Sequence, residues 1–275
     1  MPEPKNKAPQ GELLAARYRP DVPKSEGPWN EVLATILAHR SVRAFTEEPV
    51  SDAALRQIVA AAQSAATSSN LQAWSAIAVR DQARKARLAH LCDDQKFISQ
   101  APLFLAWCAD LSRARRLSPH DLDGADYFEA FVLAAVDTAL AAQNAALAAQ
   151  SLGLGICYVG ALRDHPEEVA KELQLPPNAF GVFGMSVGHP DPAKPAFVRP
   201  RLPQEAMLHY EHYDIAGEKE AAAHYNKVHS EFQAEQDMKI ADWSERIGAR
   251  LKDAEALHGR DTLKQALQAL GFKLR

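Results

Sequence analysis

The stretch His39-Arg40-Ser41-Val42-Arg43-Ala44-Phe45 begins where the first helical pattern of the chain ends. Residues 29–38 just before it carry apolar side chains at helical spacing. Arginine offers forked donors that match phosphate oxygens, and serine adds a short donor, so the stretch suits a bound anion. A solvated basic helix end explains the same residues, because cations favour the negative end of a helix dipole. The predicted apolar face of the helix consists of Val32, Leu33, Ile36 and Leu37.

Composition limits the class of protein. The chain has 275 residues, which allows one large domain or two small ones, and 47% of them are hydrophobic. Much of that fraction is alanine and only 7% of residues are aromatic, which predicts helices packed closely through small side chains. The net charge of -4 gives no basic surplus, which argues against nucleic acid or an anionic membrane as a partner.

Cysteine and histidine usage indicates a cytoplasmic protein without a metal site. The three cysteines form no CxxC pair, which fits a reducing compartment without a disulfide framework or a structural zinc. The ten histidines show no metal-ligand spacing. Residues 1–20 lack the apolar core of a secretory signal. The apolar stretch 128–152 is interrupted by acidic and amide side chains, so we expect it not to span a bilayer.

Helical and strand patterns alternate along most of the chain. Residues 1–28 are rich in proline and charge, and predict an extended arm or a disordered lead. The charged residues 217–275 predict helices that cannot form their own core and must pack on the main body or on a partner subunit. Helices are also expected over 29–38, from 52 to about 66, and over 81–92, 126–151 and 166–175, and strands over 74–80, 103–109, 156–159 and 182–187.

Four separated segments share one chemical character, since each offers arginine, hydroxyl, amide or exposed backbone at an element end or in a connection. Singly, each has an ordinary structural explanation, such as a helix-ending loop or a solvated linker. The Gly153-Leu154-Gly155 sequence is not a dinucleotide fingerprint, because it follows a helix and precedes a strand. The four segments are 39–43, 67–72, 158–163 and 199–201.

Taken in chain order, these segments resemble the nitroreductase family, and within it the oxygen-insensitive nitroreductases and FMN reductases. The resemblance runs from about residue 28 to about residue 215. Several ordered motifs that agree are far more specific than any single one. The matching motifs are H-R-S-x-R-x-F at 39–45, P-V-S at 49–51, S-S-x-x-Q at 68–72, the Q-x-x-[VI]-x-x-A-P segment at 95–102, the helix ending in L-G-L-G at 137–155, and R-P-R-L-P at 199–203.

The resemblance implies an α+β fold, with a central, mostly antiparallel sheet flanked by helices. It also implies an entwined homodimer with FMN sites along the interface. We expect an N-terminal extension over 1–27, an FMN-binding domain over 28–215, and a helical C-terminal extension over 216–275. That extension would pack on the body or on the partner subunit.

The resemblance also assigns cofactor residues, all of them ligands of FMN rather than catalytic groups. Arginines would oppose the phosphate charge, the loop at 67–70 would reach the ring edge or ribityl chain from the partner subunit, and the segment at 158–161 would line the ring. No metal ligand is implied. The implied cofactor-binding residues are His39, Arg40, Ser41, Arg43, Thr67, Ser68, Ser69, Asn70, Gln95, Tyr158, Val159, Gly160, Ala161, Arg199 and Arg201.

The function implied is that of an FMN-dependent NAD(P)H oxidoreductase. It would reduce nitroaromatics or quinones by ping-pong hydride transfer through flavin N5. One alternative is an NAD(P)H:FMN reductase that supplies reduced flavin to a partner enzyme. Another is a flavin-binding dimer without turnover. In a fourth interpretation the arginines bind no ligand and are only surface charges of a helical dimer.

Two departures from the family pattern bear on function. The family has a glycine pair where this chain has Gly160-Ala161, and an alanine there would be strained if the backbone required a positive φ. NADPH-preferring relatives have an arginine-rich loop where residues 231–239 are acidic on balance, which disfavours the 2′-phosphate of NADPH. Arg163 remains as a possible substrate-binding residue. The sequence therefore predicts weak NADPH preference, or a preference for NADH.

Overall fold

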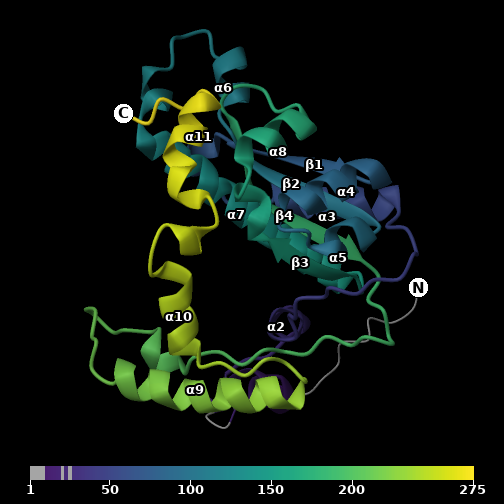
Figure 1. Cartoon of the computed structure of the whole chain (residues 1–275), viewed down its shortest axis with the longest axis vertical. Coiled ribbons are helices and arrows are strands. Elements are labelled where there is room, and N and C mark those ends of the chain that lie inside the picture. Colours follow the sequence, from purple (N-terminus) through teal and green to yellow (C-terminus); the bar gives the residue numbers. More distant parts are fainter. Residues whose placement is uncertain (1–9, 20–21, 24–26) are drawn as a thin grey trace. The chain divides into compact units, whose positions relative to one another are not determined.

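The structure is a computed structural model that describes residues 10–19, 22–23 and 27–275 (Figure 1). Contacts divide the chain into two compact units, and each is described by itself. The first unit combines the described residues up to Arg40 with Phe197–Leu257. The second unit combines Ser41–Ala196 with His258–Arg275.

The first unit is helical. Its helices are α1 (Gln10–Tyr18), α2 (Glu31–Leu37), α9 (Glu218–Glu235) and α10 (Trp243–Leu251). The second unit holds the strands β1 (Trp74–Val79), β2 (Leu103–Asp110), β3 (Gly155–Val159) and β4 (Ala179–Gly188). Its helices are α3 (Asp52–Gln63), α4 (Gln82–Leu91), α5 (Lys96–Gln100), α6 (Ser112–Leu117), α7 (Phe128–Ser151), α8 (Pro166–Leu173) and α11 (Leu263–Ala269).

The four strands form one sheet in the order β1-β2-β4-β3, and every neighbouring pair is antiparallel. A short parallel bridge joins Ser41 to Ile156 at the β3 edge. The predicted α+β class with a mostly antiparallel sheet is therefore confirmed. The expected strand over 182–187 is longer than its apolar run suggested, because β4 begins at Ala179 and pairs there with Asp110 of β2.

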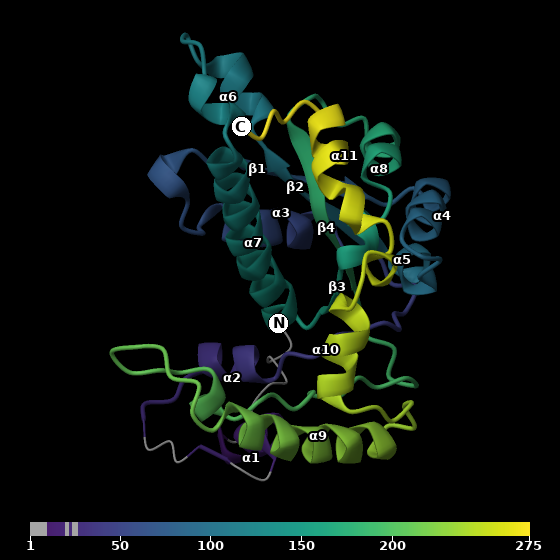
Figure 2. The same cartoon turned by 60° about the vertical axis from the view of Figure 1, so that its left-hand side comes forward.

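Helices cover both faces of this sheet, and β2 shows why. All eight β2 residues are buried, and successive side chains of a strand point to opposite faces. Leu103, Leu105 and Trp107 belong to the core cluster that includes residues of α3 and α7. Phe104 and Ala106 belong to the cluster that includes residues of α4 and α8. Figure 2 shows α7 on one side of the strands and α4 and α8 on the other.

Helix α7 packs on the sheet through alanine, as the composition predicted. Ala141, Ala142, Ala145 and Ala149 are fully buried, and their short side chains let the helix axis approach the strands closely. By length and composition α7 is apolar enough to cross a membrane, with a mean hydropathy of 1.4. The sequence analysis took its polar residues to exclude a membrane span, and by this test they do not. A core helix passes the same test, and the buried alanines place α7 in a protein core.

Helix α1 contradicts the prediction of an extended or disordered arm over 1–28, as far as residues 10–18 are concerned. Leu13 and Leu14 are buried, and Leu13 packs with Ala34 and Ala38 of the α2 segment. The contacts that stabilise α1 come from a distant segment, so its local composition did not reveal them. Residues 1–9, 20–21 and 24–26 of the predicted arm lie outside the described residues.

Most of the predicted apolar face of α2 is exposed in this chain. Val32, Leu33 and Ile36 are 64%, 37% and 39% exposed. The buried residues are instead the small Ala34 and Ala38, which face α1. The pattern predicted the helix correctly, but of the four apolar residues only Leu37 packs on this cluster, and the other three stay exposed within the described chain.

The C-terminal residues pack in the second unit. Leu267 and Phe272 are buried in a cluster with Phe180 of β4 and Ala134 of α7. The buried carboxylate of Asp126 accepts hydrogen bonds from Arg115 and from Lys273 near the C-terminal end. These bonds lower the pKa of Asp126.

Candidate functional site

In the second unit, the Ser41–Phe45 segment runs beside the edge strand β3. The N–H of Val42 donates to the carbonyl of Ile156 at 2.9 Å, and Phe45 forms an antiparallel bridge with Pro190. Val42 is buried against Gly155, where any Cβ would lie 2.7 Å from the Val42 Cβ. Gly155 is therefore required for this close approach. Because extended residues alternate in direction, a buried Val42 leaves Ser41 and Arg43 exposed.

Arg43 lies near the segment that carries Gln95. Its guanidinium is 5.9 Å from the ring centroid of Phe97 in α5, and Gln95 is the residue just before that helix. Asp93 and Asp94 both adopt positive φ, which turns the chain sharply into α5. Arg43 also lowers the pKa of the Cys157 thiol, although burial raises it more. The structure thus brings Ser41, Arg43, the Gln95 segment and β3 together.

The predicted ring-lining segment follows directly from β3. Tyr158 packs edge-on against Phe183 at 5.3 Å, and burial raises the pKa of its hydroxyl, so it stays neutral. Val159 is 1% exposed and faces the core, so it can offer a ligand only its backbone. Neither Gly160 nor Ala161 has a positive φ, and Ala161 is therefore accommodated without strain.

The loop at 67–70 is held by a residue that sequence reasoning missed. Asp137 of α7 is 2% exposed, and its carboxylate accepts from the Thr67 hydroxyl at 2.5 Å and from the N–H groups of Ser68 and Ala73 at 3.1 Å. Ser69 and Asn70 have φ of 47° and 55°, and both are exposed. The available signal was an aspartate in the middle of an alanine-rich helix, far from either helix end.

Two groups of predicted residues lie at opposite corners of the sheet. Ser41 bridges β3, whereas the Asp137-anchored loop precedes β1, and β1 and β3 are the two edges. Thr138, next to Asp137, donates to the carbonyl of Cys108 at the far end of β2. The separation is roughly 14 Å across three strand spacings and about 20 Å along the strands. One chain therefore does not bring the 41–43 and 67–70 segments together.

The remaining predicted residues belong to the first unit. The guanidinium of Arg40 donates to the carbonyl of Ala38 at 3.2 Å, and His39 is half-buried. Arg199 lies over the Phe232 ring at 6.0 Å from its centroid. Arg201 is exposed, and one nitrogen of its guanidinium donates to the carbonyls of Arg199 and Pro200.

The chemistry of these side chains fits an anionic ligand. Arg201 has further N–H donors beyond the nitrogen that binds carbonyls, and guanidinium donors match phosphate oxygens in pairs. Tyr225 donates its hydroxyl to the carbonyl of Pro200 at 2.8 Å, which fixes the turn between Arg199 and Arg201. A phosphate monoester carries nearly two negative charges, which this turn is suited to bind.

Arg163 and the 231–239 stretch both have local structural partners. The Arg163 guanidinium donates to the carbonyl of Val182 in β4. Gln233 is fully buried, donates to the carbonyl of Lys239 at 2.7 Å and accepts from the N–H of Ala241. Glu231 and Asp237 remain exposed. The stretch is therefore a compact helix end with acidic side chains outward, and it carries no arginine.

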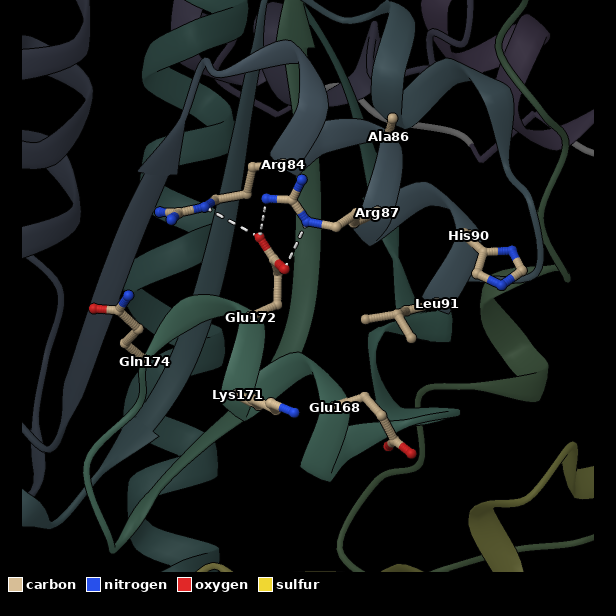
Figure 3. Close-up of a pocket in the computed structure, with 9 residues that line it drawn as sticks. All are labelled: Arg84, Ala86, Arg87, His90, Leu91, Glu168, Lys171, Glu172 and Gln174. Atoms are coloured by element: carbon tan, nitrogen blue, oxygen red, sulfur yellow. Dashed lines mark hydrogen bonds and ion pairs between the residues drawn. The ribbon is translucent and has the colours of Figure 1, made fainter.

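An open hollow between α4 and α8 contains none of the predicted site residues (Figure 3). Glu172 of α8 lies at its centre and accepts hydrogen bonds from Arg84 and Arg87 of α4. The bond from Arg87 is the main cause of the lowered pKa of Glu172. The carboxylate is already paired with two arginines, so it is not available to a ligand. We therefore interpret these residues as a salt bridge that joins α4 to α8.

Known proteins resemble this chain over most of its length. A model of the nitroreductase family matches residues 36–189, and a model of that family's C-terminal domain matches residues 199–275. An FMN reductase [NAD(P)H] of Bacillus subtilis is 35% identical over 254 residues, which cover 89% of this chain and 99% of that protein. An oxygen-insensitive NADPH nitroreductase of Salmonella typhimurium is 38% identical over 197 residues, which cover 72% of this chain and 80% of that protein.

A solved structure shares the fold. The NADPH:FMN oxidoreductase from Vibrio harveyi complexed with NAD+ has a TM-score of 0.80 and 33% identity. The match covers 90% of this chain and 100% of that structure.

Proposed function

The chain belongs to the nitroreductase family, and from this membership we propose that it transfers electrons from NADH or NADPH to nitroaromatic compounds or quinones in a ping-pong reaction. It is an NAD(P)H-dependent flavin oxidoreductase with FMN as cofactor. FMN, when bound, supplies the ring that accepts hydride and passes electrons to the acceptor. The chain's own residues bind and orient it, and no side chain is proposed as an acid, base or nucleophile.

The observation that carries this proposal is the arginine turn at 199–201. Its exposed Arg201 and its fixed backbone fit a phosphate monoester. We propose that Arg40, Arg199 and Arg201 oppose the FMN phosphate with His39 beside them. Within the second unit, we propose FMN contacts for the exposed Ser41 and Arg43, for Gln95 and for the backbone of residues 158–161.

The loop at 67–70 supports a homodimer with shared cofactor sites. Within one chain this loop lies at the corner of the sheet opposite Ser41, so a second copy must supply it if both contact one FMN. Helix α7 also exposes a row of apolar side chains, and α2 exposes Val32. The row on α7 consists of Phe128, Val132, Val136 and Leu140. Exposed apolar surface of this kind marks an interaction site. We propose that these surfaces are covered in the dimer.

An anaerobic experiment tests the function. Purified protein reconstituted with FMN should lose its long-wavelength flavin absorption when NADH or NADPH is added. Subsequent addition of a nitroaromatic compound or a quinone should restore it, with parallel initial-rate lines when both substrates are varied. Absorption that stays unchanged with both nicotinamides would contradict the proposal and favour a flavin-binding dimer without turnover.

A second candidate function is reduction of free flavin for a partner enzyme. It is favoured by the name of the Bacillus subtilis relative, an FMN reductase. Free FMN used as the acceptor in the same assay separates the two, because only a flavin reductase would turn it over faster than nitroaromatics or quinones. We further propose a cytoplasmic location, since Cys92, Cys108 and Cys157 are all free thiols, which suits a reducing compartment.

Nucleotide preference is expected to depart from NADPH. Residues 231–239 present Glu231 and Asp237 to solvent and contain no arginine, so they repel a 2′-phosphate. We predict that kcat/KM for NADPH exceeds that for NADH only weakly, or that NADH is preferred. The double variant Glu231→Arg/Asp237→Arg should raise kcat/KM for NADPH ~10-fold and leave that for NADH unchanged. Each new arginine can form one exposed charge pair with the 2′-phosphate, and such a pair contributes roughly 1 kcal/mol or less. A strong NADPH bias in the unmodified protein would contradict the prediction.

A further inference from the structure

We propose that Arg17 of α1 is a positioning residue for the cofactor phosphate, acting through the main chain at His39 and at Arg199–Arg201. The inference rests on the proposed function, in which the 199–201 turn binds that phosphate. Arg17 precedes both segments that match the family models, which begin at residue 36. The N-terminal extension would then be part of the cofactor site rather than an appendage to it.

Three carbonyl groups accept hydrogen bonds from the Arg17 guanidinium. Its Nη1 donates to the carbonyl of Arg199 at 2.8 Å. Its Nη2 donates to the carbonyls of Leu37 at 2.9 Å and of His39 at 2.8 Å. Residues 37 and 39 close α2 and open the basic stretch, whereas Arg199 lies 160 positions or more further along the chain. A single side chain thus joins the two arginine-bearing segments of the first unit.

The backbone of Arg17 completes this connection. The N–H of Arg201 donates to the carbonyl of Arg17 at 2.9 Å, so the side chain and the main chain of one residue hold both ends of the Arg199–Arg201 turn. Gln204 donates to the Tyr18 hydroxyl at 3.3 Å just beyond. Because Arg17 is only 6% exposed, water cannot readily replace these bonds.

The charge of Arg17 fits the same role. Burial lowers the pKa of the Arg17 guanidinium, and nearby Arg201 lowers it further. Arginine nevertheless stays protonated at neutral pH, so two like charges are held close together. Among the described residues no carboxylate forms a salt bridge with Arg17. A bound dianion relieves this repulsion, whereas a neutral ligand does not.

A purely structural role for Arg17 predicts a different result. If it only fastens α1 to the first unit, its loss weakens the fold and affects every flavin alike. If it positions the phosphate-binding turn, its loss weakens FMN and spares riboflavin, which has the same ring and ribityl chain but no phosphate. The ratio of the two dissociation constants therefore separates the roles.

The experiment uses the full chain without cofactor, with FMN and riboflavin Kd values from flavin fluorescence titration and thermal unfolding as a check of folding. Arg17→Met should lower the riboflavin-to-FMN Kd ratio ~10-fold, through loss of charged hydrogen bonds, with riboflavin affinity unchanged. Arg17→Lys, which keeps the charge but not the fork, should recover part of the ratio. Arg19→Met, which removes the neighbouring pair with Glu235, should leave the ratio at the wild-type value.

Each contrary outcome is informative. Equal loss of FMN and riboflavin affinity in Arg17→Met, or no loss of either, overturns the inference. If Arg17→Met does not fold, Arg17→Lys decides, and a wild-type ratio in that variant overturns it. Arg201→Ala serves as the reference for the proposed function. A wild-type ratio in Arg201→Ala shows that the phosphate site itself is misplaced, whereas a lowered ratio there with an unchanged one in Arg17→Met refutes only the role of Arg17.

Discussion

Replacing Val136 and Leu140 with glutamate should convert the proposed dimer into monomers at micromolar protein concentration. These side chains are 52% and 44% exposed on α7, although they are apolar. Phe128 and Val132 precede them at four-residue intervals and are 54% and 37% exposed. Residues four apart lie on one side of a helix, so the four form a continuous apolar row. We expect this row to be buried against the second copy.

The expected effect is large because a symmetric dimer contains every substitution twice. Burial of a valine or leucine side chain contributes about 1.5–3 kcal/mol. Val136 and Leu140 are already about half covered within one chain, so losing four such side chains from the interface removes about 3–6 kcal/mol, which raises the dimer Kd by roughly two to four orders of magnitude. The added carboxylates would have to be buried without partners, which increases the effect.

Sedimentation equilibrium of the variant and the wild-type protein measures this change. Ala83→Glu is the matched control, since Ala83 is exposed on α4, which covers the other face of the sheet. The control should remain dimeric. Circular dichroism distinguishes folded monomers from unfolded chains, because an obligate dimer has no stable monomer. A double variant that still sediments as a folded dimer would show that the α7 row is not the interface.

Local sequence patterns predicted the elements whose cause is local. The apolar runs of β2 and the alanine content of α7 gave the right element type, since each reflects burial of consecutive or regularly spaced residues. Helix α1 was missed because its stability comes from Ala34 and Ala38, some twenty residues away. Most of the apolar face of α2, namely Val32, Leu33 and Ile36, remains exposed within one chain, since periodicity shows that a face is apolar and not what covers it.

The residues of the candidate site also fall into those that local sequence predicts and those that depend on distant partners. Ser41 and Arg43 could be expected to be available to a ligand, because Val42 between them is apolar and an extended chain alternates. The anchoring roles of Asp137 and Arg17 could not be predicted, because their hydrogen-bond partners lie 64 to 70 and 20 to 182 positions away. Chain order contains no signal for such pairs until the fold is known.

Asp137→Ala should destabilise the protein by about 3–5 kcal/mol, because the carboxylate accepts three hydrogen bonds and charged acceptors give the strong ones. The Ala73 N–H is buried and would lose its partner, whereas the exposed Ser68 N–H can bind water. The loop it holds contains positive φ at Ser69 and Asn70, a backbone geometry that non-glycine residues keep only when contacts enforce it. Loss of the anchor should therefore also release the loop.

Urea unfolding of the cofactor-free protein measures the first effect, and FMN titration measures the second. Asp137→Asn should lose roughly half as much stability, since its carbonyl still accepts from Thr67 and Ala73 while its amide faces the Ser68 N–H. Glu129→Ala, an exposed carboxylate in the first turn of the same helix, should lose ~0.5 kcal/mol. If Asp137→Ala unfolds at the same urea concentration as Glu129→Ala, the carboxylate does not hold the loop. The proposal that Asp137 positions the part of the cofactor site supplied by the partner subunit would then be wrong.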